Sequence, residues 1–291
     1  MAPKRKDNFL RLALPKGRMQ VEIFRLLAEA GIKLRSGSRD YRPKISLAGF
    51  EAKILKPRSI VEMLHVGSRD IGFAGSDWVI ELGAELVEVL NTDLDPVRIV
   101  AAAPKDFVVD GRLPDVPLVV ASEYKRLTTN WINQKGLSAT FVRSYGATEV
   151  FPPEDADCIV DNTTSGSTLR ANGLLIVDQL MTSSTRLYVN PRVLDCKVQR
   201  EKIERFVMLL RSVLESRRRV MVEVNVSAAK LEAVISVLPC MREPTISSLY
   251  GNSGYAVKAA VPRDDLPRVI PEIKASGGND IVITQLTGIV P

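Results

Sequence analysis

The segment from Asp157 to Gly173 carries the strongest chemical pattern in the sequence. Its apolar run, Cys158 to Val160, predicts a buried strand that delivers Asp157 and Asp161 to its carboxyl end. A loop rich in hydroxyl groups and glycine follows, and we expect it to open a short helix. Backbone N–H groups at a helix start bind anions, and a glycine lets the backbone approach a phosphate closely. The expected anion-binding residues are Thr163, Thr164, Ser165, Gly166, Ser167 and Thr168.

The two acids beside this loop narrow the class of ligand. Carboxylates hold sugar hydroxyls or the water shell of a magnesium ion. Acids next to a phosphate loop therefore favour a phosphorylated sugar over a bare anion. The alternative is a polar loop that only caps a helix. The order of strand, acid, hydroxyls, glycine and helix favours the binding site.

Composition excludes several other classes of protein. The chain has 291 residues, of which 45% are hydrophobic and 25% charged, which is ordinary globular composition rather than that of a disordered, collagen-like or coiled-coil chain. No apolar run approaches the roughly 18 residues of a membrane span, so we expect no membrane partner. Aromatic residues make up 5% and do not alternate with basic ones, so we expect no nucleic-acid partner.

Charge, histidine and cysteine content limit the chemistry further. The net charge is +6, and part of it lies in two basic runs, Lys4–Lys6 and Arg217–Arg219, which we expect to be solvated. The one histidine, His65, falls at a predicted helix end, so a histidine metal site or a histidine-activated nucleophile is not expected. Three widely spaced cysteines predict neither a metal site nor a disulfide framework. With no apolar signal segment after Lys6, a cytoplasmic protein with reduced thiols is expected.

The elements that position the loop alternate between strand and helix. A first set runs from Phe9 to Ala103, with Ser59 as a predicted helix N-cap, and a second set runs from Leu118 to Leu180, with Ser122 in the same role. This alternation predicts an α/β fold with a mainly parallel sheet. The strand Thr185–Val189 is expected to return the chain to the first set. Two lobes crossed twice by the chain would form a cleft, a preferred ligand position.

The last part of the chain predicts a separate small domain. Apolar residues at helical spacing predict a long helix over Glu201–Glu215. The remaining segments follow the order βαββαβ, which is the ferredoxin-like arrangement. We therefore expect lobe 1 over residues 1–104 plus 185–217, lobe 2 over residues 105–184, and a C-terminal domain over residues 218–291.

Three motifs give the sequence a family resemblance. The run Asp161–Leu174 resembles the phosphoribosyl-diphosphate loop of the ATP phosphoribosyltransferases, and Leu12–Arg18 and Gly72–Asp77 resemble two further motifs of that family. The segments around Pro244–Ile246 and Lys274–Gly278 resemble the regulatory domain of its long form. The resemblance implies two periplasmic-binding-protein-like lobes of type II and a C-terminal ferredoxin-like βαββαβ regulatory domain.

The resemblance also implies a reaction. Members join ATP to 5-phosphoribosyl 1-diphosphate with magnesium and release pyrophosphate, in the first step of histidine biosynthesis. Adenine N1 attacks ribose C1, so no nucleophile of the enzyme is needed, and catalysis rests on positioning and electrostatics. Mg²⁺ is expected to arrive with the substrate rather than on protein side chains.

Site roles follow residue by residue from the matched motifs. Asp161, with Asp157 behind it, would hold the ribose hydroxyls, and residues 163–168 would hold the 5-phosphate. The expected nucleotide- and phosphate-binding residues are Lys16, Arg18, Lys56, Gly75, Ser76, Asp77 and Glu149. For Lys56 and Glu149 a solvated surface charge is the open alternative. The chain departs from the family at Asn162 and Thr163, where apolar residues are frequent, and at the bulky Trp78.

Regulation and assembly are also implied by the resemblance. Histidine and AMP are the expected inhibitors, and Asn225, Met241 and Thr245 the expected histidine-binding residues. Asn225 lies where an acid is sometimes found, so it would hydrogen-bond the effector amine rather than pair with its charge. A homo-oligomer, from dimer to hexamer, is expected, without a separate synthetase-like partner.

Two other classes of function remain open at this point. Two α/β lobes also describe solute receptors, although receptors usually carry a secretion signal. A regulatory subunit that kept the fold and lost the chemistry is the other alternative. The loop after Asp161, together with Lys16 and Arg18, favours the enzyme over both.

Overall fold

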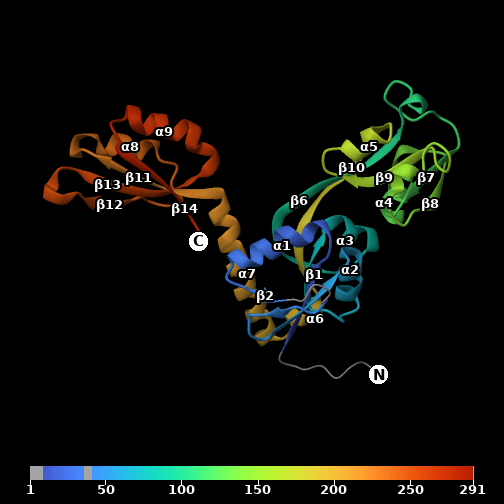
Figure 1. Ribbon diagram of the computed structural model, residues 1–291, viewed down its shortest axis with the longest axis horizontal. Coiled ribbons are helices and arrows are strands. Elements are labelled where there is room, and N and C mark those ends of the chain that lie inside the picture. Colours follow the sequence, from blue (N-terminus) through green and yellow to red (C-terminus); the bar gives the residue numbers. More distant parts are fainter. Residues whose placement is uncertain (1–8, 36–40, 291) are drawn as a thin grey trace. The chain divides into compact units, whose positions relative to one another are not determined.

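The chain forms two compact units (Figure 1). The computed structural model describes residues 9–35 and 41–290, so the basic run at 4–6 lies outside the described residues. The first unit holds Met1–Arg25 and Ile32–Lys202, and the second holds Leu26–Gly31 and Ile203–Pro291. Helix α7 (Lys197–Arg218) belongs to both. The three-part division expected from the sequence stays a prediction.

The first unit is built on an eight-stranded sheet with the order β4-β1-β5-β10-β6-β9-β7-β8. Its strands are β1 (Leu10–Pro15), β4 (Phe50–Leu55), β5 (Ile71–Gly75), β6 (Val87–Pro104), β7 (Leu118–Ser122), β8 (Ala139–Arg143), β9 (Cys158–Thr163) and β10 (Leu174–Val189). Two short strands, β2 (Leu34–Arg35) and β3 (Lys44–Ile45), pair separately.

Strand direction divides this sheet into two outer sets and a central pair. Strands β1, β4 and β5 are parallel, and so are β7, β8 and β9. The long strands β6 and β10 run antiparallel to each other and to their outer neighbours. The expected mainly parallel sheet is therefore correct for each outer set and wrong for the centre. Carboxyl ends of parallel strands lie at one edge, so each set gathers the loops that follow its strands.

The two predicted strands over residues 174–180 and 185–189 are one strand, β10. The polar residues between them interrupt the apolar pattern but do not break the strand. Instead, the pairing of β10 with β6 shifts register at several points, including between Ser183 and Thr185. Asp93 and Asp95 on β6 have positive φ angles of 55° and 49° in the same stretch. Such irregularities redirect side chains and occur next to sites.

Short helices connect the strands of the first unit. They are α1 (Arg18–Glu29), α2 (Pro57–His65), α3 (Ser76–Leu82), α4 (Lys125–Lys135), α5 (Ser167–Ala171) and α6 (Pro191–Leu194), with 3-10 turns η1 (Lys105–Phe107) and η2 (Thr148–Val150). The prediction of Ser59 as an N-cap is wrong, because Pro57 already occupies the first helical position. Ser122 is not the N-cap of α4 either; it ends β7, and its Oγ accepts the Tyr124 N–H.

The core of the first unit lies on both faces of its sheet. β1 is buried over Leu12–Pro15, and α2 covers it with Ile60, Val61 and Leu64. The second parallel set has its own buried cluster around Val120 and Val160. Burial of one such side chain contributes about 1.5–3 kcal/mol. The two outer sets are thus firm supports for the loops at their carboxyl ends.

The second unit carries a four-stranded antiparallel sheet with the order β12-β13-β11-β14. Its elements after α7 are β11 (Arg219–Val226), η3 (Ala228–Lys230), α8 (Leu231–Val237), β12 (Thr245–Ser248), η4 (Tyr250–Asn252), β13 (Tyr255–Pro262), η5 (Arg263–Asp265), α9 (Leu266–Ala275) and β14 (Asn279–Gln285). The expected ferredoxin-like βαββαβ domain is confirmed. Alternate residues of β11, Val220 to Val226, pack under α8 and α9.

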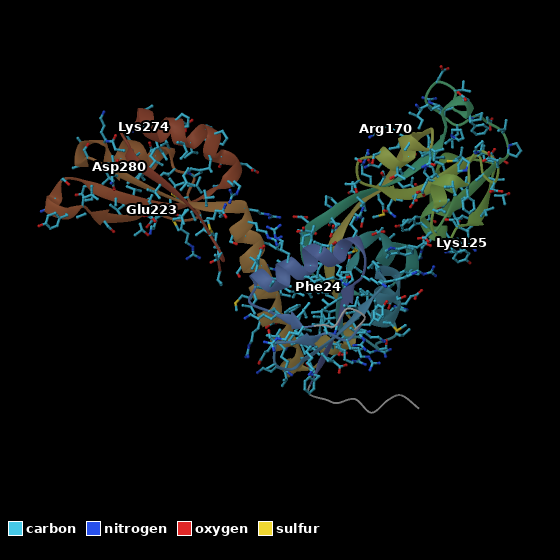
Figure 2. The ribbon with its side chains drawn as sticks, viewed as in Figure 1. Phe24, Lys125, Arg170, Glu223, Lys274 and Asp280 are labelled. Carbon is cyan, nitrogen blue, oxygen red and sulfur yellow. The ribbon has the colours of Figure 1, made fainter. Side chains whose placement is uncertain are left out.

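The other face of this sheet is free of helices within the described residues of the second unit. Figure 2 shows Lys274 on the helical side and Glu223 on the opposite side. Glu223 pairs there with Lys258 of β13 at 2.7 Å. The helix that precedes the sheet, α7, buries the predicted apolar face that includes Ile203, Phe206 and Leu210. No helix in the described ranges is long and apolar enough to cross a membrane.

Candidate active site

A cleft of about 330 Å³ lies in the first unit, where loops of both parallel sets meet the irregular stretch of β6 and β10. The two parallel sets of strands contribute lining residues from the ends of their strands and the segments that follow, and the central strands β6 and β10 contribute the bottom of the cleft. The cleft is lined by Lys16, Arg18, Met19, Pro57, Gly75, Asp77, Trp78, Asp95, Val97, Tyr124, Asn162, Ser183, Ser184 and Thr185.

Two cations follow β1 at one side of the cleft. Lys16 and Arg18 are both exposed. Lys16 Nζ donates to the Tyr41 hydroxyl at 2.8 Å and lies 4.8 Å from the centre of that ring, and this contact lowers the pKa of Tyr41. Arg18 donates from its guanidinium to the Thr164 hydroxyl at 3.1 Å. The structure therefore brings Arg18 to the predicted loop, and Lys16 lines the same cleft.

A buried carboxylate stands at the start of α3. Asp77 is 5% exposed, and its Oδ1 accepts the Ser183 hydroxyl at 2.6 Å. Ser183 Oγ in turn accepts the Asp77 N–H and the Ser76 hydroxyl, each at 3.1 Å. A Cβ on Gly75 would collide with the Asp77 carboxylate. The predicted motif at residues 75–77 is thus a tight turn that fixes a negative charge beside the cleft.

Asp161 is a carboxylate whose charge is disfavoured where it lies, near the end of β9. Burial raises its pKa to about 6, and the nearby Glu149 and Glu123 act in the same direction, while the Asn162 N–H, which donates to Oδ1 at 2.7 Å, opposes them. Glu149, on η2, is therefore close enough to Asp161 to act on its charge, whereas Glu123 was not predicted from the sequence. A group of this kind gains from a neighbouring positive charge.

The loop after β9 is held open by its own hydrogen bonds. Thr163 Oγ1 accepts the Gly166 N–H at 2.9 Å, and Gly166 has a φ of 74°, which favours glycine. Arg170 on α5, labelled in Figure 2, donates to the Ser165 carbonyl at 3.0 Å. The side chains of Thr164, Ser165, Ser167 and Thr168 are exposed. Several hydroxyl side chains of the loop thus face solvent at the helix start, whereas the N–H groups of Gly166 and Ser167 are bonded to the Thr163 and Ser165 side chains.

Asp157 lies away from this loop, which corrects the sequence-based expectation that both acids stand at the carboxyl end of the strand. It precedes β9, while Asp161 is the fourth residue of that strand. At about 3.3 Å per residue, the four-residue step separates them by about 13 Å. The Asp157 carboxylate instead accepts the Val119 N–H of β7 at 2.7 Å. Its contact is structural.

Lys56 remains the least constrained of the predicted cations. It is exposed at the N-cap of α2, and the next residue, Pro57, lines the cleft. Its position after β4 puts it at the same sheet edge as Lys16. Its contact with a phosphate stays a prediction.

Several cleft residues were missed in the sequence. Tyr124 follows β7, Asp95 lies on β6, and Ser183 to Thr185 lie on β10. Burial raises the pKa of Asp95, and Arg18 opposes that shift. A usable signal was the run of hydroxyl residues 182–185 inside an otherwise strand-like segment, because polar residues in a central strand need partners or a cavity.

No protein metal cage is present in the described ranges, where no group of three or more histidine, cysteine or acidic side chains is arranged to hold an ion. The acids near the end of β9 still fit a divalent metal that arrives on a substrate and keeps its waters. Mg²⁺ commonly binds in this way, through one or two carboxylates and substrate phosphates.

The predicted effector residues lie on the second unit. Asn225 is on β11, and its Nδ2 donates to Asp280 Oδ2 of β14 at 3.3 Å. Met241 and Thr245 are exposed, the latter at the start of the edge strand β12. Asp280, with a φ of 47°, was not predicted. Asn225 therefore has the carboxylate of Asp280 as its direct neighbour.

Comparison with known proteins agrees with this geometry. Residues 56–212 match the family HisG, ATP phosphoribosyltransferase, and residues 216–288 match the HisG C-terminal domain. An ATP phosphoribosyltransferase of Pelotomaculum thermopropionicum is 33% identical over 97% of this chain and 99% of its own. One from Chlorobium phaeobacteroides is 34% identical over 94% of this chain and 95% of its own.

A solved structure resembles most of the chain. The ATP phosphoribosyl transferase (HisG:HisZ) complex from Thermotoga maritima gives a TM-score of 0.63 at 28% identity. The match covers 71% of this chain and 99% of that one. The likeness therefore leaves more than a quarter of this chain without a counterpart in that structure.

Proposed function

Because this chain belongs to the ATP phosphoribosyltransferase family, we propose that its cleft binds both substrates and that its second unit binds histidine as an inhibitor. The family identifies the protein as a pentosyltransferase of the first step of histidine biosynthesis. The proposal concerns which residues do the work.

The reaction joins ATP and 5-phosphoribosyl 1-diphosphate. The lone pair of adenine N1 forms a bond to ribose C1 as the C1–O bond to the diphosphate breaks, and pyrophosphate leaves with that electron pair. Positive charge develops on the ribose ring as the bond breaks. An enzyme accelerates such a step by holding the reactants in line and by placing fixed charges where charge develops.

The observation that carries the assignment is the meeting of Arg18 with the loop after β9. Residues 163–168 would hold the 5-phosphate with backbone N–H and hydroxyl groups. Arg18, which contacts Thr164 at 3.1 Å, would add a positive charge there. Bidentate arginine contacts are well matched to phosphate oxygens. With the 5-phosphate held there, the ribose would lie beside Asp161, two residues before the loop.

Asp161 would favour the developing positive charge on the ribose and accept hydrogen bonds from its hydroxyls. Glu149 acts on Asp161 and would strengthen the local negative field. Lys16 and Lys56 would contact phosphates of ATP or of the leaving group. The turn of Gly75, Ser76 and Asp77 would shape the nucleotide side of the cleft. Asp157 receives no substrate contact in this proposal.

Members of the family use a divalent metal, and we assign Mg²⁺ to the diphosphate substrate. When bound, the ion neutralises charge on the leaving pyrophosphate. Asp161 and Glu149 would hydrogen-bond its waters. The support for this is that the two carboxylates are close enough for Glu149 to act on the charge of Asp161.

Histidine and AMP are the proposed inhibitors. Histidine would bind at the second unit, where Asn225, Met241 and Thr245 were predicted. Asp280 would supply the negative charge for its ammonium group, because it lies 3.3 Å from Asn225. AMP would compete in the cleft for the nucleotide position.

We further propose a homo-oligomer, from dimer to hexamer, in the cytoplasm. Cys158, Cys196 and Cys240 are free, as thiols of that compartment are. The related Thermotoga structure is a complex of two proteins, HisG and HisZ. This chain carries its own C-terminal domain over residues 216–288, so we expect it to be regulated without a second protein.

A spectrophotometric assay tests the assignment. Purified protein is mixed with ATP, 5-phosphoribosyl 1-diphosphate, Mg²⁺ and pyrophosphatase, with and without histidine. Phosphoribosyl-ATP that forms and is suppressed by histidine supports both the cleft and the effector site. Formation without suppression removes the effector assignment. Ligand binding by folded protein without turnover would instead indicate a regulatory or binding role.

A further inference from the structure

A continuous series of hydrogen bonds crosses the cleft. Tyr124 donates its hydroxyl proton to Asp77 Oδ2 at 2.8 Å, and the Tyr124 hydroxyl oxygen accepts a hydrogen bond from Asn162 Nδ2 at 3.2 Å. Asn162 also donates to Asp161 Oδ1, from its backbone at 2.7 Å and from Nδ2 at 3.2 Å. The other carboxylate oxygen of Asp77, Oδ1, accepts a hydrogen bond from the Ser183 hydroxyl. The series links the start of α3 to the end of β9.

The donors and acceptors in this series fit only one arrangement. A carboxylate oxygen accepts hydrogen bonds, so the single proton of the Tyr124 hydroxyl points to Asp77. The lone pairs of that hydroxyl then face the Asn162 amide. Tyr124 is 1% exposed, and burial together with the nearby Asp77 raises its pKa. The phenol therefore stays protonated at neutral pH, and its role is geometric rather than acid–base.

Asn162 is the member of the series that contacts both Tyr124 and Asp161. A leucine at this position would have a similar size but no side-chain donor. Such a side chain would leave the Tyr124 oxygen without the amide donor and would remove one donor from Asp161. The asparagine therefore adds a link between Asp161 and Tyr124 that the apolar residue cannot form.

We propose that Tyr124 and Asn162 are positioning residues that fix the Asp161 carboxylate relative to the α3 side of the cleft. The inference rests on the proposed role of Asp161 toward the ribose. Substrate binding draws on the loop of residues 163–168 and on Arg18, which the series does not include. Loss of the link should therefore slow the chemical step more than it weakens binding, because small displacements of a reacting pair cost rate.

The test compares Tyr124→Phe, Asn162→Leu and the double variant. Tyr124→Phe removes one oxygen atom, and Asn162 is exposed, so the second change leaves the core untouched. We expect kcat to fall about 5- to 10-fold in each single variant, with KM for both substrates within about twofold. The double variant should lose no more than the worse single, since both changes break one link.

The pH profile supplies a readout that a merely structural role would not move. Asn162→Leu removes a donor from the Asp161 carboxylate, so the acid limb of kcat against pH should move to higher pH. Tyr188→Phe is the matched control. Tyr188 is a buried tyrosine of the same unit, 4% exposed and outside the cleft lining, and its variant should keep wild-type kcat.

Three results would overturn the inference: multiplied losses in the double variant, a raised KM with kcat intact, or an unmoved acid limb in Asn162→Leu. Thermal melting of each variant checks the fold, and Asn162→Leu decides alone if Tyr124→Phe melts early. Asp161→Asn distinguishes a failure of this inference from a failure of the proposed role of Asp161. If it is inactive while Asn162→Leu behaves as wild type, the link fails and the role of Asp161 stands. If it is fully active, the role of Asp161 fails first.

Discussion

Two acids four residues apart, Asp157 and Asp161, have different environments in this protein. Asp161 lies near the end of β9 beside the proposed ribose position, and Asp157 holds the neighbouring strand through the Val119 N–H. Exchanging Asp161 for Asn removes the charge and keeps the shape. We expect turnover to fall about 100-fold or more, as when a fixed group that stabilises the transition state is lost. Steady-state kinetics of phosphoribosyl-ATP formation measure the loss.

The same change should make the protein more stable at neutral pH. Burial raises the folded-state pKa of Asp161 to about 6, above its unfolded value of 3.8. The folded state thus holds the proton more tightly, and stability falls as pH rises from about 4 to 6. The ionised group then costs at most about 3 kcal/mol above pH 6. Asp161→Asn should remove this cost, so its melting temperature at pH 7.5 should exceed that of the wild type.

A melting temperature that stays equal at pH 7.5 would contradict the buried, disfavoured charge. For activity, the ionised carboxylate is the useful form. The wild-type kcat/KM should therefore decline as pH falls through about 6, and residual activity of Asp161→Asn should not show this limb.

For Asp157→Ala we expect the reverse of the Asp161→Asn result, with stability lowered and turnover nearly unchanged. The substitution leaves the Val119 N–H without its carboxylate partner, which costs about 1–3 kcal/mol. The expected result is a lower melting temperature with kcat within about twofold of wild type at 20 °C. A large loss of kcat in a folded variant would return Asp157 to the site.

The sequence could predict a site over residues 157–173, but the prediction gave both acids to it. Chain direction already puts Asp161 next to the loop and Asp157 at the other end of the apolar run, whereas the contact of Asp157 with Val119 depends on strand pairing and could not be foreseen. Tyr124 was harder to foresee, because its partner Asp77 is 47 positions away and nothing local marks it. Ser183 fell in the polar gap between two predicted strands, and its contact with Asp77 depends on the single long strand β10 and its shifted register with β6.

At the scale of elements, the loop between β9 and α5 depends on one backbone conformation. Gly166 has a φ of 74°, and a Cβ there would come within 3.2 Å of the Arg170 guanidinium. We expect Gly166→Ala to raise KM for 5-phosphoribosyl 1-diphosphate about tenfold, because the strained loop no longer presents its N–H groups to the phosphate. Thr168→Val, which removes one hydroxyl from the same loop, should lower turnover as well.

Gly136→Ala is the matched control for backbone strain. Gly136 ends α4 with a φ of 66° and has open space around its Cβ position. Its variant should lose a similar amount of stability, about 1 kcal/mol, while KM stays unchanged. Equal KM values for both glycine variants would remove the loop from phosphate binding.

The pair of β11 and β14 carries the proposed effector charge. Asp280→Asn keeps a hydrogen-bonding group beside Asn225 but removes the carboxylate that would meet the histidine ammonium. We expect the histidine concentration for half-inhibition to rise at least about tenfold, with basal kcat unchanged. Asp264→Asn, an exposed acid on η5, should leave inhibition as it is. A normal inhibition curve for Asp280→Asn would assign the ammonium contact to another residue.

At the scale of the whole molecule, sequence patterns succeeded where each element repeats a simple rule. The ferredoxin-like order of the second unit and the outer parallel sets follow from alternating apolar segments. The centre of the first sheet could not be predicted in this way. Its strands β6 and β10 are long and pair irregularly, and the polar residues inside them resemble ends of strands in the sequence pattern. The cleft is built at that irregular centre, so its floor was the least predictable part of the fold.

Helices α1 and α7 each run from one unit into the other, and we expect the two units to separate in function. Removing residues 220–291 leaves the first unit with all of α7 and takes away the sheet that holds Asn225 and Asp280. We expect phosphoribosyl-ATP formation to continue at a measurable rate and histidine inhibition to disappear, while AMP, which would bind in the cleft, still inhibits. Assembly measured by light scattering should shift to smaller species.

Histidine inhibition that survives in the shortened, folded protein would place the effector site in the first unit. Loss of AMP inhibition together with that of histidine would place both inhibitors on the second.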